Sequence, residues 1–153
     1  ILNELLINWR KKISFVSQST YLLDESILNN ITFHHNYESV NVSKLEKAIN
    51  IACLKEYVDS LNLKLDTIVG ERGSKISGGE LQRICIARAV YNDSEILILD
   101  EFTSALDKKT QSQIIENIFK LNKTIIVASH RLSTLKYCDE VYEVSKNKLK
   151  KIK

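Results

Sequence analysis

An unbroken apolar run, Ile96 to Leu99, ends in the acidic pair Asp100 and Glu101, and it restricts the fold of this chain more than any other feature. Such a run predicts a strand that is covered on both faces within a parallel sheet. Thr124 to Ala128 predicts a second buried strand. Because strand and helix patterns alternate around these two runs, the chain is expected to be of the α/β class.

The first half of the chain is expected to be mainly helical. Ile13 to Val16 predicts one short strand, which leads into a loop at Gln18. From Asp24 to about Leu61 the pattern turns helical, with a helix beginning near Ser43. The apolar stripe of that helix is formed by Leu45, Ala48, Ile49 and Ala52.

After a glycine-bearing connector from Thr67 to Ser77, a helix is predicted from Gly79 to about Tyr91, with Leu81, Ile84 and Ala87 facing inward. The remaining predicted elements are a helix marked by Ile114, Ile115, Ile118 and Leu121, a short helix from Leu132, and strands at Glu140 to Val144 and Lys148 to Ile152.

Composition narrows the possible partners. At 153 residues the chain suits a single domain, and its formal net charge of +3 is small. Much of the excess lies at the end, where we interpret Lys146, Lys148, Lys150, Lys151 and Lys153 as a solvated tail rather than a nucleic-acid or membrane-binding patch. We therefore expect no nucleic-acid partner.

The cysteines argue against a disulfide framework or a zinc site. Cys53, Cys85 and Cys138 are odd in number, widely spaced and without a C-x-x-C pair, so reduced thiols are expected. No apolar run approaches the roughly 18 residues that a bilayer span requires.

Asp100 and Glu101 follow a predicted strand, and ligands of open α/β sheets gather beyond the carboxyl ends of the strands. In phosphoryl transfer, one of two adjacent carboxylates can hold magnesium while the other orients or deprotonates the attacking water. A pair of solvated turn acids would have the same sequence. The two residues alone leave both interpretations open.

Ser77, Gly78, Gly79 and Glu80 precede a predicted helix, whose free N–H groups and positive dipole end attract an anion. The two glycines would let the backbone approach a phosphate closely. Ser77-x-x-Glu80 is also a capping box that stabilises any helix start. Asp107 is a candidate helix N-cap. Gln18, near the start of the chain, and His130 each follow a predicted strand.

In their order along the chain, Ser77 to Arg83, Ile96 to Glu101, Ser104 to Asp107 and His130 resemble the nucleotide-binding domain of an ABC transporter. The continuation Leu81-Gln82-Arg83 and then Ala87-Arg88-Ala89 resembles the ABC signature motif. Gln18 resembles the Q-loop glutamine of the same family. After it, Tyr21 to Ile27 and Asn30-Ile31 resemble exporter features, and so does Gly70 to Gly73, just before the signature motif.

This resemblance implies roles for individual residues. Asp100 and Gln18 would hold magnesium, Glu101 would act on the attacking water, and His130 would bind the γ-phosphate of ATP. Gln18 would also take part in catalysis by approaching the attacking water, and would link the site to the membrane domain. The nucleotide-binding residues implied for the site on a second, head-to-tail domain are Ser77, Gly78, Gly79, Glu80 and Asp107.

The chain departs from the family pattern at several positions. Glu80 stands where glutamine is most common, and Phe102 stands where a small residue or proline is usual; His34 and His35 match no family motif and are interpreted as surface loop residues. No G-x-x-x-x-G-K-[ST] phosphate loop is present. Since methionine is also absent, we expect a domain that lacks roughly its first third.

The implied fold is a P-loop NTPase-like (RecA-like) α/β core, incomplete at the N-terminus, with a helical signature subdomain. Residues 1–153 would form this partial ABC ATPase domain, with about 24–91 as the helical subdomain. It would bind and hydrolyse ATP with Mg²⁺ at the cytoplasmic face of a membrane, together with a second nucleotide-binding domain and transmembrane domains.

Three alternatives concern the function. The amino-acid sequence from Ala48 to Leu61 and around His130 to Asp139 is similar to that of exporters that flip lipid-linked saccharides, although peptide and drug exporters share much of it. A soluble ABC ATPase of translation or DNA repair is a second possibility. Fewer than sixty residues separate Gln18 from Ser77, which leaves no room for the long insertion of the repair type. A third is a fragment that is inactive alone because the phosphate loop is missing.

Overall fold

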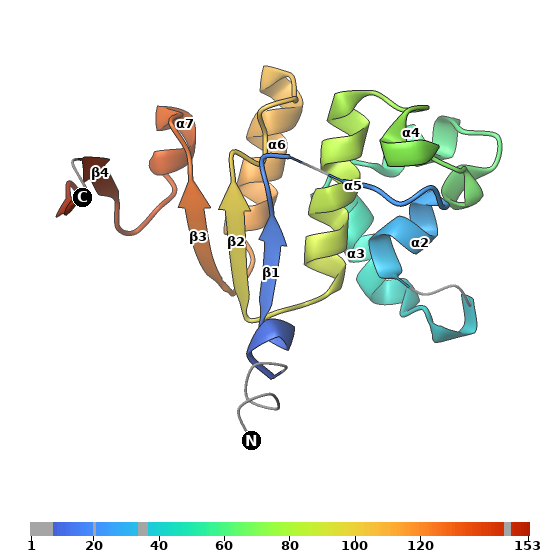
Figure 1. Cartoon of the computed structure of the whole chain (residues 1–153), viewed down its shortest axis with the longest axis horizontal. Helices are drawn as coiled ribbons and strands as arrows, with labels where there is room; N and C mark the ends of the chain where they lie inside the picture. Colours follow the sequence, from blue (N-terminus) through green and yellow to red (C-terminus); the bar gives the residue numbers. More distant parts are fainter. Residues whose placement is uncertain (1–7, 20, 34–36, 146–147) are drawn as a thin grey trace.

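A parallel sheet with helices packed on one side forms the centre of the computed structural model, which describes residues 8–19, 21–33, 37–145 and 148–153 (Figure 1). Its elements are β1 (Ile13–Val16), α2 (Ile27–Thr32), α3 (Val42–Ile51), α4 (Lys55–Ser60), α5 (Gly78–Tyr91), β2 (Ile96–Asp100), α6 (Lys108–Phe119), β3 (Thr124–Ala128), α7 (Leu132–Leu135), β4 (Tyr142–Ser145) and β5 (Lys148–Lys151), with short 3₁₀ turns at Tyr37–Ser39, Lys64–Asp66 and Glu71–Gly73. His34 and His35 lie outside the described residues.

The sheet brings the ends of its strands to one edge. Its order is β1-β2-β3 and all pairings are parallel, with Val16 opposite Leu99 and Asp100 opposite Ala128. The carboxyl ends of the strands therefore meet at the upper edge of the sheet in Figure 1. This confirms the predicted α/β class and places the loops after all three strands side by side.

The helical half lies between β1 and β2 in the chain and beside the sheet in space (Figure 1). The helix predicted near Ser43 begins at Val42, after the Asn41 side chain accepts a hydrogen bond from the N–H of Lys44. α3 and α2 both pack against α5. Ile84 and Ala87 of α5 are fully buried, as their helical spacing predicts.

The prediction that β2 and β3 are buried on both faces is wrong for the described residues. Leu97 and Leu99 of β2 are buried, whereas Ile98 is only half-buried. On the neighbouring strands, Phe15 is 58% exposed and Ile126 is 53% exposed. An apolar run shows that a strand can be covered on both faces, but the elements that cover it are set by the rest of the fold. Within the described part, β3 is also an edge strand.

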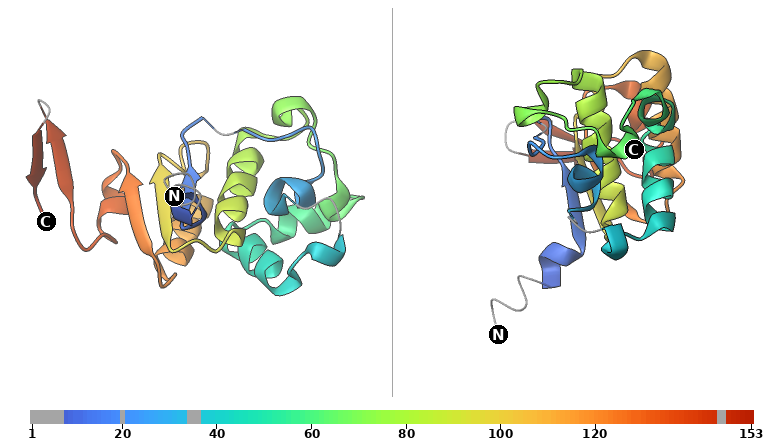
Figure 2. Two further views of the ribbon diagram at one scale, coloured as in Figure 1. Left: turned by 60° about the horizontal axis from the view of Figure 1, so that its bottom comes forward. Right: turned by 90° about the vertical axis from the view of Figure 1, so that its right-hand side faces the viewer.

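The C-terminal strands form a separate antiparallel hairpin, β4 with β5, that projects away from the parallel sheet (Figure 2). Its residues are exposed, and both predicted strands are confirmed to within two residues. Cys53, Cys85 and Cys138 are free thiols. In the described ranges, no helix combines the length and hydropathy that crossing a membrane requires.

Candidate functional site

Gln18, Glu101 and His130 meet at the upper edge of the sheet. The Nε2 atom of Gln18 donates a hydrogen bond of 3.0 Å to Oε2 of Glu101, and Nδ1 of His130 lies 2.8 Å from Oε1 of the same carboxylate. Each residue follows a different strand, β1, β2 or β3. The parallel sheet therefore joins three side chains that the sequence only placed after separate strands.

Glu101 has an unusual backbone conformation. Its φ is 43°, in the left-handed region, and its N–H donates a hydrogen bond of 3.0 Å to the carbonyl oxygen of Ala128. Such a conformation costs a residue with a side chain about 1–3 kcal/mol and persists only where the surroundings hold it. The carboxylate is 28% exposed while the His130 side chain is 68% exposed. The site is thus open to solvent on the histidine side.

Asp100 is the last residue of β2 and is half-buried. Among the residues that the structure describes, no group of three or more His, Cys, Asp and Glu side chains is placed to hold a metal ion. Magnesium commonly takes only one or two carboxylates from the protein, with waters and substrate phosphates as its other ligands. The Asp100 carboxylate and the Gln18 amide oxygen, whose partner nitrogen contacts Glu101, are oxygen donors that suit this pattern.

The start of α5 contains the predicted capping box. The Ser77 N–H donates a hydrogen bond of 2.7 Å to Oε2 of Glu80, the Ser77 hydroxyl contacts the same oxygen, and the Glu80 N–H donates to Ser77 Oγ over 3.3 Å. An Arg83 guanidinium nitrogen lies 3.8 Å from Oε1 of Glu80 and offsets its charge. The cap uses the N–H of Glu80, whereas the N–H groups of Gly78 and Gly79, which come before it in the first turn, have no partner within the helix and suit an anion.

Asp107 also has a structural role in this conformation. It is the N-cap of α6, where its carboxylate accepts hydrogen bonds of 3.0 Å from the N–H groups of Lys109 and Thr110. Hydrogen bonding, chiefly from the Thr110 side chain, lowers the pKa of Asp107 below its ordinary value. In the described contacts, neither Asp107 nor the residues from Ser77 to Glu80 hydrogen-bond to Glu101. The predicted site residues therefore form two groups.

Two further side chains near these groups were not predicted as site residues. Gln82 is 2% exposed and bonds to Ser104 and Ala105, in the loop between Glu101 and Asp107. Arg131, next to His130, contacts the side-chain oxygen of Gln111 at 2.5 Å. Gln82 lies on the same helical stripe as Cys85, Ile86 and Ala89. A polar residue on such an apolar stripe is the signal that could have found it, because a buried amide requires internal partners.

Comparisons with known proteins find related sequences and a similar solved structure. Residues 3–104 match the sequence profile of the ABC transporter family. The chain is 38% identical to an ATP-dependent lipid A-core flippase of Vibrio cholerae over 146 residues, and 39% identical over 133 residues to a lactococcin-G-processing and transport ATP-binding protein of Lactococcus lactis. These alignments cover 94% and 86% of this chain.

A solved structure of a bacterial Atm1-family ABC exporter with ATP bound is also similar, with a TM-score of 0.87 and 32% identity over 94% of this chain. The chain spans only part of these proteins: 25% of the flippase, 19% of the lactococcin-G protein and 25% of the Atm1-family chain.

Proposed function

This chain belongs to the ABC transporter family as an exporter-type ATP-binding domain, and on that premise we propose that it serves a transporter which hydrolyses ATP to move a substrate across a membrane. The observation that carries the proposal is the contact of Gln18 and His130 with the two oxygens of Glu101. These are the three side chains to which the family resemblance assigns catalysis. We place the domain at the cytoplasmic face of the membrane.

In the proposed reaction, water attacks the γ-phosphate of ATP and yields ADP and inorganic phosphate. Glu101 orients the water and accepts its proton, because its carboxylate is held at the open edge of the sheet. His130 binds the γ-phosphate, and its exposed ring leaves room for a ligand. Asp100 and the amide oxygen of Gln18 would hold Mg²⁺, which neutralises phosphate charge when bound.

We further propose that two such domains pair head to tail. The start of α5, with Ser77, Gly78, Gly79 and Glu80, would bind the phosphates held by the opposite domain, and Asp107 would lie at the interface. A helix N-terminus suits this role because its N–H groups and dipole favour an anion. In the domain organisation that we propose, residues 24–91 form the helical signature subdomain and the rest forms the α/β core.

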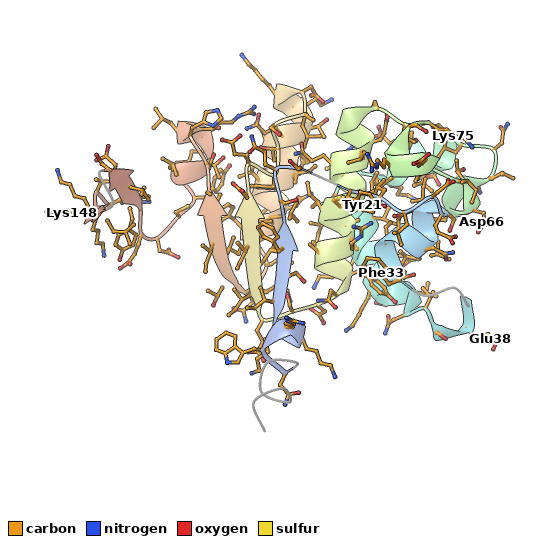
Figure 3. The ribbon with its side chains drawn as sticks, viewed as in Figure 1. Tyr21, Phe33, Glu38, Asp66, Lys75 and Lys148 are labelled. Atoms are coloured by element: carbon orange, nitrogen blue, oxygen red, sulfur yellow. The ribbon has the colours of Figure 1, made fainter. Side chains whose placement is uncertain are left out.

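Several apolar side chains of the helical half are exposed, and a transporter offers a partner for them. Tyr21, Leu23 and Phe33 are 56%, 37% and 58% exposed. Figure 3 shows Tyr21 and Phe33 on the helical side of the molecule, away from the hairpin that carries Lys148. We propose that this patch contacts the transmembrane domains. Arg88 would transmit the contact to α5, because its guanidinium bonds to the Tyr21 carbonyl oxygen and lies 4.8 Å from the Phe33 ring centre.

As the cargo we propose a lipid-linked saccharide, with a peptide as the competing class. Two observations support this cargo. The sequence from Ala48 to Leu61 and from His130 to Asp139 is similar to that of exporters that flip lipid-linked saccharides, and a lipid A-core flippase is among the relatives. The lactococcin-G protein is similar to the same degree. Transport of a lipid-linked sugar and of a peptide by the assembled transporter, measured side by side, would distinguish them. Transport of the peptide alone would contradict the cargo proposal.

Glu101→Gln tests the catalytic assignment in the assembled transporter. Removing the base is expected to lower ATP turnover about 10²- to 10⁴-fold, while ATP binding persists because the amide has the same shape. Glu95→Gln is the matched control, since Glu95 is an exposed carboxylate whose partner is Lys12. Turnover of the Glu101→Gln transporter equal to that of the wild type would show that the assignment is wrong.

ATP binding by these 153 residues alone gives a second test. The sequence contains no phosphate loop, so we expect calorimetry with millimolar ATP and magnesium to detect only weak binding. Tight binding would reveal a phosphate site other than the one proposed.

A further inference from the structure

Gln82 connects the start of α5 to the loop that follows Glu101. Its side chain is 2% exposed, and both ends of the amide are used: Nε2 donates a hydrogen bond of 3.2 Å to Ser104 Oγ, and Oε1 accepts one of 2.9 Å from the Ala105 N–H. We propose that Gln82 is a positioning residue that couples the two nucleotide sites of the paired domains. This inference rests on the proposed function.

The two connected segments are also in close contact. A β-carbon at Gly79 would lie 3.4 Å from the Ala105 carbonyl oxygen and 3.7 Å from a methyl group of Leu106. One at Gly78 would lie 3.8 Å from the β-carbon of Ala105. The backbone of the first helical turn therefore rests against the loop, and the Gln82 amide fixes the position of one relative to the other.

The loop is continuous with Glu101 through short hydrogen-bonded turns. The Ser104 N–H donates to the Glu101 carbonyl oxygen over 3.0 Å, and the Leu106 N–H donates to Thr103 over 3.3 Å. At its far end Asp107 caps α6. A displacement of Ser104 and Ala105 is thus passed to Glu101 within one turn of chain rather than absorbed by a long flexible segment.

In the proposed dimer these two segments serve different sites. The start of α5 acts on the nucleotide held by the opposite domain, whereas Glu101 acts on the nucleotide of its own domain. Gln82 lies between them and hydrogen-bonds to the loop through both ends of its side chain. When the start of α5 closes on the nucleotide of the opposite domain, it would therefore displace Ser104 and Ala105. This displacement would reposition Glu101 at the nucleotide of its own domain.

Gln82→Met is the principal test, because methionine has a similar volume and makes neither hydrogen bond. ATP hydrolysis by the assembled transporter would be measured against ATP concentration. We expect the Hill coefficient for ATP to fall toward ~1, the value for independent sites, and kcat to fall about tenfold, as loss of two hydrogen bonds supports. The affinity for a non-hydrolysable ATP analogue should stay unchanged. Gln113→Met, on the exposed face of α6, is the matched control and should leave all three unchanged.

Ser104→Ala guards against a folding defect in the principal variant, because Ser104 is exposed and its loss removes only one of the bonds. We expect a smaller decrease in the Hill coefficient, and no further decrease when it is added to Gln82→Met. Full cooperativity in Gln82→Met, or additive effects in the double variant, would overturn the inference. Failure of the proposed function looks different: the wild type would then hydrolyse no ATP, or Glu101→Gln would keep its turnover.

Discussion

The Nδ1 atom of His130 lies 2.8 Å from Oε1 of Glu101, although 29 residues separate them in the sequence. The other oxygen of the same carboxylate accepts a hydrogen bond from Gln18. Each carboxylate oxygen thus has its own partner, and the imidazole ring is held with Nδ1 towards the acid. Its Nε2 atom is then the one that can reach a ligand.

His130→Ala should lower ATP turnover of the assembled transporter about 10²-fold or more, because the hydrogen bond to the reacting phosphate and the contact with Glu101 are both lost. Binding of a non-hydrolysable analogue should weaken far less. Steady-state hydrolysis and equilibrium binding measure the two quantities. Ser133→Ala, an exposed substitution in α7, is the control, and equal turnover in the two variants would contradict the role of His130.

Glu80→Gln should strengthen ATP-dependent pairing of the domains. Glutamine can also complete a capping box, so stability should change little. Removing a carboxylate near the proposed phosphate site should tighten pairing by about fivefold, a modest gain because Arg83 already offsets the charge. Sedimentation at increasing ATP would measure it, with Glu116→Gln as the exposed control. Weaker pairing in Glu80→Gln would show that the carboxylate assists binding.

Phe102 is 1% exposed, so the unusual residue after Glu101 is part of the core. Phe102→Ala should lower the free energy of unfolding by about 3–5 kcal/mol, through lost burial and the cavity that remains. Urea denaturation of the chain checks this value. Phe15→Ala is the matched control, because Phe15 is 58% exposed. Similar losses in the two variants would argue against the packing of Phe102.

Arg88 joins α5 to two earlier segments. Its guanidinium donates hydrogen bonds of 2.6 and 3.0 Å to Asn30 and of 3.0 Å to the Tyr21 carbonyl oxygen. Arg88→Met keeps the aliphatic stem but removes all three hydrogen bonds, so the free energy of unfolding should fall by about 3 kcal/mol. Arg88→Lys should recover little of this free energy of unfolding, because an ammonium group cannot reproduce the planar fork of the guanidinium group. Full restoration by lysine in thermal denaturation would contradict this explanation, and the exposed Arg72→Met is the control.

Asp107 makes one contribution to stability depend on pH. Hydrogen bonds from Thr110 and Lys109 lower its pKa from the ordinary 3.8, so the carboxylate stabilises the fold above about pH 4 and this contribution is lost as the pH falls through the lowered pKa. Asp107→Asn can still cap α6 but does not titrate. The Tm advantage of the wild type at pH 7 should therefore shrink as the pH falls below about 4. A constant difference in Tm across this range would contradict the assignment.

The fold was predictable from sequence where the signal is local. The four-residue stripe of α3, the capping box of Ser77 and Glu80, and the strand before Asp100 depend on neighbours within a few residues. Coverage of the sheet was predicted less well, because Ile126 has the same hydropathy whether or not another element packs on it. Gln82 was missed for a similar reason, since its partners Ser104 and Ala105 lie more than twenty residues away.

The sequence by itself determined the order of the elements, the α/β class and the residue types able to act on a phosphate, because periodicity, caps and motif spacing act over short stretches of chain. Only the tertiary structure decided which of those residues touch. Gln18 and Glu101 are 83 positions apart and meet because β1 pairs with β2 in parallel, which brings the ends of both strands to one edge. Strand pairing depends on contacts between residues that are far apart in the sequence, and it is this pairing that brings separate residues together into one site.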